Sequence, residues 1–464
     1  MRTIWFRAAG SLAFLGLVPA CATASGPRPV FADGEAVPAA EGVWHSTEKG
    51  WILEIGEDEI TRWQVTPAGC YLTPQPDDTT PLMGQVDYQL FTPAPNGSSA
   101  RFQYLPGDAA AYFERLDQLP KDCGAADLTS EAAVFEVFAS VMEEHYGFFE
   151  QRGVDWPAEV AKRRDQVKDG MGDDALWQVF DELISLLGDS HTKILGMVDG
   201  EPQRIQAGLG STLPMIRNGI GEGAWVGGLV DQLVEDLLDP GAELIADRVV
   251  LGEIDGRIGY LQIFTMGGFS DAEVPGSIDW SKAELAALDR ILDTAMTRFE
   301  GHDAVILDLS NNRGGYDAVT RAIAALFTDN AFIGYRVSVP GELESLTEYL
   351  IEPHDGRRFT GPVYLMTSDV TVSGGEITTL MLNALPNVTL VGTTTRGAFS
   401  TPLAKPLPNG WYLELSNEVF ESADGDVFEG RGIPPDMGIE IYPEDDPIGG
   451  HAAAIRQIVE LVGD

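Results

Sequence analysis

The chain has 464 residues and carries 72 Asp and Glu against 30 Lys and Arg, which gives a net charge of -42. A field of this sign repels nucleic acid and anionic lipid headgroups, so we exclude both as partners. Hydrophobic residues make up 44% of the sequence, the composition of a globular protein, and the length predicts more than one domain.

Residues 1–24 have the pattern of an export signal. Two arginines precede an apolar run at 8–20 that is too short to span a bilayer as a mature helix. The residues that end at Cys21 resemble a bacterial lipoprotein box, which would place a lipid anchor on Cys21, whereas 22–24 resemble an ordinary cleavage site. We favour the lipoprotein. We therefore expect a periplasmic or outer-membrane-anchored bacterial protein, with free secretion as the alternative.

The next segment, 25–40, is rich in Ala, Gly and Pro and predicts a flexible linker. Residues 41–124 contain short runs of alternating polarity separated by turn residues, which predicts a small β domain. Two cysteines remain once the signal is removed, Cys70 and Cys123. In an exported protein, an even number of cysteines predicts a disulfide between them, and two separate buried thiols are the alternative.

Residues 125–195 change to helical spacing. Apolar side chains recur every three to four residues in 134–142 and again in 176–187. The second run ends at a glycine, and Ser190-His191 follows directly. The stretch 196–254 is Gly-rich with short strands and one acidic helix, and predicts a β-rich connection.

Residues 255–442 alternate between strand and helix patterns. The alternation predicts an α/β core with a mostly parallel sheet, and 443–464 predicts a C-terminal helix. The chain as a whole is therefore expected to be an α/β multidomain protein. The expected core strands lie at 260–263, 304–309, 363–366 and 388–391, and the helices between them lie at 282–299, 316–327 and 374–384.

Two turns of this core carry paired glycines between a strand and a helix. Ser373 precedes Gly374 at the start of a helix, the geometry expected of an exposed nucleophile. Gly314-Gly315 follows another buried strand, where exposed N–H groups bind anions and ligands. Taken singly, each segment also fits a helix cap or a tight turn.

These turns, with Ser190-His191 before them and Glu429 after them, resemble the tail-specific (C-terminal processing) peptidases and the tricorn core. That catalytic domain is shared with interphotoreceptor retinoid-binding proteins. The resemblance covers roughly residues 130–442. It implies an α/β core of the crotonase-like, tail-specific peptidase type.

The family that this chain resembles has two catalytic styles. Its processing branch uses a Ser–Lys dyad, but the matching stretch here, 392–398, has no lysine, and the nearest one, Lys405, stands in a different context. Its tricorn-like branch uses a Ser-His-Ser-Glu tetrad. The resemblance to that branch implies a tetrad of Ser373, His191, Ser190 and Glu429.

The role of each residue follows from what serine chemistry needs. Ser373 is the expected nucleophile and requires a base within hydrogen-bond reach, which His191 supplies. Ser190 and Glu429 would orient the imidazole.

An oxyanion hole would complete the site. The N–H of Gly374 and one N–H from Gly314 or Gly315 are the expected donors. We expect no metal and no cofactor, because no cluster of histidines and carboxylates has the spacing of metal ligands.

The sequence therefore predicts a serine peptidase that acts on a peptide or protein through an acyl-enzyme. A non-catalytic binder of hydrophobic ligands or peptides on the same fold is one alternative, and an esterase with the same tetrad is another. The acidic residues are spread along the chain, and we interpret them as solvated surface, with attraction of basic substrates as the alternative. The stretch 196–254 is too short for the PDZ domain of the processing proteases, so a preference for C-terminal tails is not implied.

Overall fold

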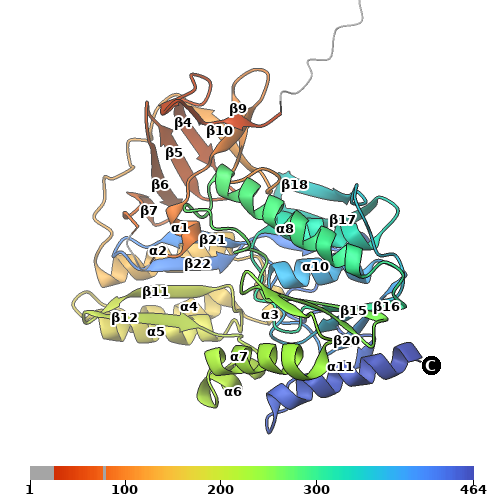
Figure 1. Cartoon of the computed structure of the whole chain (residues 1–464). Helices are drawn as coiled ribbons and strands as arrows, with labels where there is room; N and C mark the ends of the chain where they lie inside the picture. The colour runs from red at the N-terminus through yellow and green to blue at the C-terminus, as the bar shows by residue number, and fades with distance from the viewer. Residues whose placement is uncertain (1–25, 77–79, 464) are drawn as a thin grey trace, which may run out of the picture.

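The computed structural model describes residues 26–76 and 80–463. The expected export signal and the lipid anchor at Cys21 lie outside the described residues. Figure 1 shows the N-terminal β domain above a layer of helices and strands, with the core sheet and the C-terminal helix below it. No helix in the described part of the chain is long and apolar enough to cross a membrane.

The N-terminal β domain is an eight-stranded antiparallel sheet in the order β1-β8-β9-β10-β4-β5-β6-β7. The short helix α1 (Leu82–Gln85) lies between β7 and β8. Cys70 on β7 is joined to Cys123 by a disulfide, with the two Cα atoms 4.4 Å apart. The strands are β1 (Arg28–Pro29), β4 (Gly42–Ser46), β5 (Trp51–Ile55), β6 (Ile60–Thr66), β7 (Gly69–Leu72), β8 (Leu90–Pro93), β9 (Ser99–Gln103) and β10 (Ala111–Leu116).

The expectation of a flexible linker over 25–40 is wrong from residue 28 onward. This stretch forms β1 and the small hairpin of β2 (Phe31–Ala32) and β3 (Glu35–Ala36). Val30 is fully buried, and its N–H donates to the carbonyl oxygen of Gln89 at 2.9 Å. A Pro- and Gly-rich composition conceals the few apolar side chains that attach the segment to the sheet.

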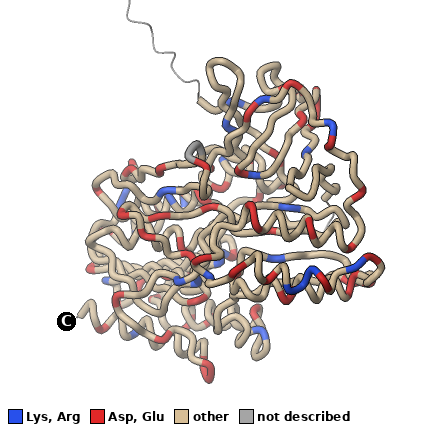
Figure 2. Tube along the Cα trace, turned by 180° about the vertical axis from the view of Figure 1, so that it is seen from behind, with Lys and Arg blue, Asp and Glu red and all other residues tan. Residues whose placement is uncertain are grey.

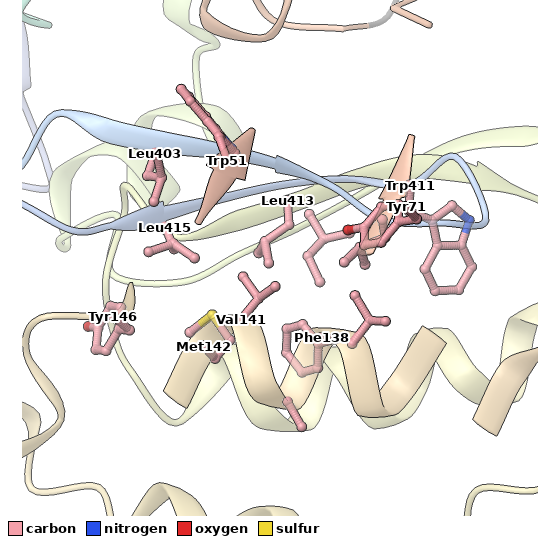
Figure 3. Close-up of a cluster of buried hydrophobic side chains, with 14 of the residues drawn as sticks. Trp51, Tyr71, Phe138, Val141, Met142, Tyr146, Leu403, Trp411, Leu413 and Leu415 are labelled. Carbon is pink, nitrogen blue, oxygen red and sulfur yellow. The ribbon is translucent and has the colours of Figure 1, made fainter. Parts of the chain in front are cut away.

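The helical region contains the two helices that the periodicity predicted, α2 (Glu131–His145) and α5 (Asp173–Ser185). Two further helices, α3 (Phe149–Arg152) and α4 (Trp156–Arg164), lie between them. It packs on a four-stranded sheet in the order β12-β11-β22-β21. The β domain, these helices and this sheet share one hydrophobic core. Figure 3 shows the α2 side chains facing the strand residues. The strands are β11 (Lys193–Val198), β12 (Glu201–Gln206), β21 (Pro402–Pro406) and β22 (Tyr412–Ser416).

The stretch 196–254 contains strands, as predicted, but it has two helices where one was expected. It contains α6 (Thr212–Asn218) and α7 (Glu222–Gln232), which continues as a π-helical turn over Leu233–Leu237. Three glycines lower the intrinsic helix propensity of α7. Burial of Trp225, Leu229 and Leu233 in the core outweighs that cost.

The core sheet has the order β13-β14-β15-β16-β19-β20-β24, and it is parallel from β15 to β24. The predicted α/β core with a mostly parallel sheet is confirmed. The strands are β13 (Glu243–Ile245), β14 (Val249–Ile254), β15 (Ile258–Ile263), β16 (Ala304–Asp308), β19 (Val363–Thr367), β20 (Val388–Gly392) and β24 (Met437–Gly438).

Helices cover both faces of this sheet, and the strand β16 shows why. Its neighbours Ile306 and Leu307 belong to two different cores because successive strand side chains point to opposite faces. One face packs against α8 (Ile278–Arg298), α9 (Asp317–Ala324) and α10 (Gly374–Asn383), and the other against α7 and α11 (Pro447–Gly463).

A separate three-stranded sheet, β18-β17-β23, lies beside the β domain and α10. Its strands are β17 (Phe332–Val339), β18 (Glu342–Ile351) and β23 (Val419–Glu421). Figure 2 shows acidic residues distributed over the whole trace rather than gathered in one region.

Candidate active site

Ser373 stands at the turn between β19 and α10, at the carboxyl edge of the core sheet. Its backbone has φ 58° and ψ -124°, in the left-handed region that a non-glycine residue rarely adopts. The N–H of Ser373 donates to the carbonyl oxygen of Ala398 at 2.9 Å, which helps to hold this conformation. A strained strand-to-helix turn of this kind exposes a serine hydroxyl for nucleophilic attack.

The turn at Gly314-Gly315 lies directly against Ser373. A Cβ atom on Gly314 would lie 2.5 Å from the Cβ of Ser373, so the contact requires glycine. The N–H of Gly314 is already donated to Asn312 Oδ1 at 2.8 Å. Within the described residues, the N–H groups of Gly315 and Gly374 carry no hydrogen bond. Gly315 and Gly374 are therefore the candidate oxyanion donors, a choice that the sequence left open between Gly314 and Gly315.

His191 follows α5 in a tight turn built by Asp189. The buried carboxylate of Asp189 accepts the backbone N–H of His191 at 2.9 Å and the hydroxyl of Thr192 at 2.8 Å. Burial lowers the pKa of His191 to about 4, although the negative charge of Asp189 acts to raise it. The imidazole is therefore neutral at neutral pH. Its Nδ1 atom is buried and has no hydrogen-bond partner among the described residues.

The loop over residues 397–400 is held by two buried carboxylates. Glu376 accepts the N–H groups of Gly397 at 2.6 Å and Ala398 at 2.7 Å. Glu429 Oε2 accepts the N–H groups of Phe399 at 2.8 Å and Ser400 at 3.2 Å.

The same loop contacts both members of the expected acyl-transfer pair. Ala398 accepts the N–H of Ser373, and the backbone of Ser400 lies close enough to the ring of His191 to act on its pKa, which it tends to raise. The 397–400 loop therefore gathers Ser373, His191 and Glu429, which come from distant parts of the sequence.

The expected tetrad is not closed by hydrogen bonds. No hydrogen bond in the described part of the chain joins any two of the side chains of Ser373, His191, Ser190 and Glu429. The hydroxyl of Ser190 is buried without a partner there. Catalytic hydrogen bonds are often long in a free enzyme and shorten when substrate binds, so this geometry is compatible with the expected roles.

Arg152 is a site residue that the sequence analysis missed. It donates to the carbonyl oxygen of Gly188 at 2.9 Å, to that of Gly397 at 3.2 Å, and to Glu429 Oε1 at 3.2 Å. Burial and the charge of Asp189 raise the pKa of Glu429 to about 8, while Arg152 acts in the opposite direction. Nothing in the sequence marks this arginine, which stands in a short helix with no motif around it.

Lys405 is engaged elsewhere. Its side chain is fully buried, and Nζ donates to the carbonyl oxygen of Gly50 at 3.0 Å, above the ring of Trp51. Burial lowers the pKa of Lys405 well below its usual value. This lysine joins β21 to the β domain. Among the described residues, no group of three or more His, Cys, Asp and Glu is arranged to hold a metal ion.

Ser373, Gly314 and Gly315 line a cavity of about 500 Å³. A strained serine, unpaired backbone N–H groups beside it and a cavity in front of it define a serine hydrolase type of site. Residues 257–439 match the model of Peptidase family S41. The part of the chain from β15 to β24 is therefore similar to the domain of that peptidase family.

Three known proteins place this domain among its relatives. The carboxy-terminal processing protease CtpA of Bacillus subtilis (strain 168) is 26% identical over 187 residues, which are 40% of this chain and 36% of CtpA. The chain thus matches about a third of the length of that curated relative. A crystal structure of a candidate peptidase from Parabacteroides merdae ATCC 43184 has 21% identity and a TM-score of 0.57, covering 72% of this chain and 96% of that one. Mature CPAF has 12% identity and a TM-score of 0.51, covering 72% and 97%. These structures agree with the fold.

Proposed function

We propose that the chain is a serine peptidase that cleaves peptide bonds of a peptide or protein through an acyl-enzyme on Ser373. The observation that carries the proposal is the left-handed backbone of Ser373 at the start of α10, with the unpaired N–H of Gly374 next to it. The similarity of residues 257–439 to Peptidase family S41 supports the same reaction class.

The proposed chemistry begins with proton transfer from Ser373. As Oγ attacks the carbonyl carbon, the ring of His191 takes the hydroxyl proton, because a neutral imidazole is required for a general base. The carbonyl oxygen becomes an oxyanion that accepts hydrogen bonds from the N–H groups of Gly315 and Gly374. Each such donor is worth roughly 3–4 kcal/mol at the tetrahedral intermediate. His191 then gives the proton to the leaving amine, and a water molecule hydrolyses the acyl-enzyme by the same route.

Glu429 and Arg152 are proposed to act on position rather than on the proton. Glu429 binds the loop whose Ser400 backbone contacts the ring of His191. Arg152 bridges that loop to the turn before His191 through its contacts with Gly397 and Gly188. Ser190, adjacent to His191 with an unpaired buried hydroxyl, is proposed to orient the imidazole once substrate has ordered the site.

Hydrolysis of a fluorogenic peptide library tests this function. Ser373→Ala should remove nearly all activity, whereas Ser338→Ala, a partly exposed serine on β17, should retain it. Equal melting temperatures would establish that both variants fold. Hydrolysis that survives in Ser373→Ala would overturn the proposal.

We also propose that the protein is exported and anchored by a lipid on Cys21. The Cys70–Cys123 disulfide supports export because disulfides persist in oxidising compartments. Mass spectrometry of the mature protein should find a lipid-modified N-terminal Cys21. A mature N-terminus at Ser25 would instead indicate free secretion.

A further inference from the structure

The cavity in front of Ser373 is not enclosed by the S41-like domain alone. Ser373, Gly315 and Ile377 form one side, and the β domain supplies much of the remaining wall. The contribution of the β domain comes from β5, from the segment around α1, and from the loop that leads into β10. A reactive serine and a domain outside the matched family region therefore share one cavity.

Aromatic and apolar side chains dominate the lining. Such a surface binds apolar groups because their burial removes them from water, and a large aromatic side chain buries about 150–250 Å². The volume of about 500 Å³ is enough for a large side chain together with neighbouring backbone. The rings come from both parts of the chain: Trp51, Tyr88 and Tyr104 from the β domain, and Trp280, Tyr316 and Phe399 from the core.

The charged groups of the cavity are mainly acidic. The lining includes three acidic residues, Asp108, Asp317 and Glu418, and one basic residue, Lys49. Lys49 Nζ is held by Glu418 at 2.9 Å, so it is not free to bind a substrate carboxylate. Asp317 is likewise paired with Arg321, so an acidic substrate side chain would lose its hydration without meeting an unpaired cation in this lining, whereas an apolar side chain meets complementary surface.

The β-domain wall is fixed in place rather than loosely tethered. Gln89 donates to the carbonyl oxygen of Gly276 at 2.6 Å and accepts the N–H of Ile278 at 3.1 Å, which ties the start of β8 to the core. Arg62 pairs with Asp87 at 2.7 Å behind the α1 segment. A wall held in this way can discriminate between side chains by shape.

We propose that the N-terminal β domain is the specificity element of the enzyme. It forms the far wall of a pocket that takes a large apolar or aromatic substrate side chain beside the scissile bond and disfavours an acidic one. The inference rests on the proposed function, because the pocket opens onto Ser373.

The first test compares peptides that differ only in the residue next to the cleaved bond: Phe, Leu, Ala and Glu. The kcat/KM for Phe and Leu should exceed that for Ala by roughly 10–200-fold, and Glu should be lowest. Ala109→Trp, which fills the pocket from the β domain, should reduce the Phe-to-Ala ratio at least tenfold. Leu72→Ala is the matched control, since Leu72 is half exposed on β7 and does not line the cavity.

The second test is independent of catalysis. In a Ser373→Ala background, calorimetric titration should find that the Phe peptide binds at least tenfold more tightly than the Glu peptide, and that Ala109→Trp removes this difference. Equal binding of the two peptides, or the same Phe-to-Glu ratio in a folded Ala109→Trp variant, would overturn the proposed pocket. If the expected ranking is found but the wild-type protein hydrolyses no peptide, the pocket stands and the peptidase function fails.

Discussion

The backbone N–H of Ser373 donates to the carbonyl oxygen of Ala398 at 2.9 Å. This bond couples the conformation of the expected nucleophile to the 397–400 loop, and the same loop contacts the expected base through Ser400. The position of the loop should therefore affect the rate of the chemical step more than the binding of substrate.

Glu376→Gln should lower kcat by roughly 10–100-fold with little change in KM. The amide retains one oxygen acceptor, but its NH₂ group would face a backbone N–H of Gly397 or Ala398, so one of two buried hydrogen bonds is lost. Steady-state kinetics check this prediction, with Glu460→Gln on the exposed side of α11 as the matched control. A change in KM alone would contradict a positioning role for the loop.

The pH dependence of acylation should reflect the depressed pKa of His191. The ring is protonated below about pH 4 and neutral above it, so kcat/KM should rise through about pH 4 instead of the ordinary imidazole pKa near 6.5. Asp189→Asn should move this limb to lower pH, because the carboxylate acts to raise the pKa of the ring. Pre-steady-state measurements of the acylation rate from pH 3 to 8 test both statements. An acid limb centred near pH 6.5 would contradict the burial of His191.

Arg152→Met should destabilise the protein by roughly 3–5 kcal/mol, because it leaves the buried carboxylate of Asp189 without its cation and removes the donor to three oxygen acceptors, one of them on Glu429. Arg164→Met removes an exposed ion pair with Glu136 and should cost about 1 kcal/mol or less. Urea unfolding of the two variants gives the comparison. A similar decrease in the free energy of unfolding of both variants would show that the contacts of Arg152 contribute no more than an exposed ion pair.

Stability should fall as the pH rises from about 4.5 to about 8. Burial is the largest cause that raises the pKa of Glu429 to about 8 and that of Glu376 to about 7, so the folded state binds these protons more tightly than the unfolded state. The stabilisation is complete below the unfolded pKa and is lost as the pH rises through the folded value. Glu429→Gln cannot titrate and should flatten the decline in melting temperature. An unchanged slope in that variant would place the titration elsewhere.

The sequence predicted the α/β core because each of its elements is bounded by local signals. The strand β16 is an apolar run up to its last residue, Asp308, and the α10 helix begins at the Ser373-Gly374 turn. The same local reasoning expected a single helix in 196–254, where the structure has α6 and α7. The glycines of α7 hide its first turns in the sequence, and tertiary burial stabilises them. Local reasoning also failed for the segment around Val30, which packs on the β domain.

The candidate site was predictable only where a motif carried it. Ser373, His191 and Glu429 were predicted from the order of their motifs, and in the structure all three lie against the 397–400 loop. No local sequence pattern indicates Arg152 or the cavity wall that includes Trp51, because their contacts join segments that are distant in the chain. The choice of Gly315 over Gly314 as oxyanion donor likewise depends on a single hydrogen bond to Asn312.

Covalent labelling tests the nucleophile most directly. The active protein is incubated with a fluorophosphonate, digested and mapped by mass spectrometry, and the rate of labelling is measured for wild type and for His191→Ala. The account predicts that the label lies on Ser373 and that His191→Ala slows labelling by roughly 10²–10⁴-fold. A label on another serine, or an unchanged labelling rate in a folded His191→Ala variant, would contradict it.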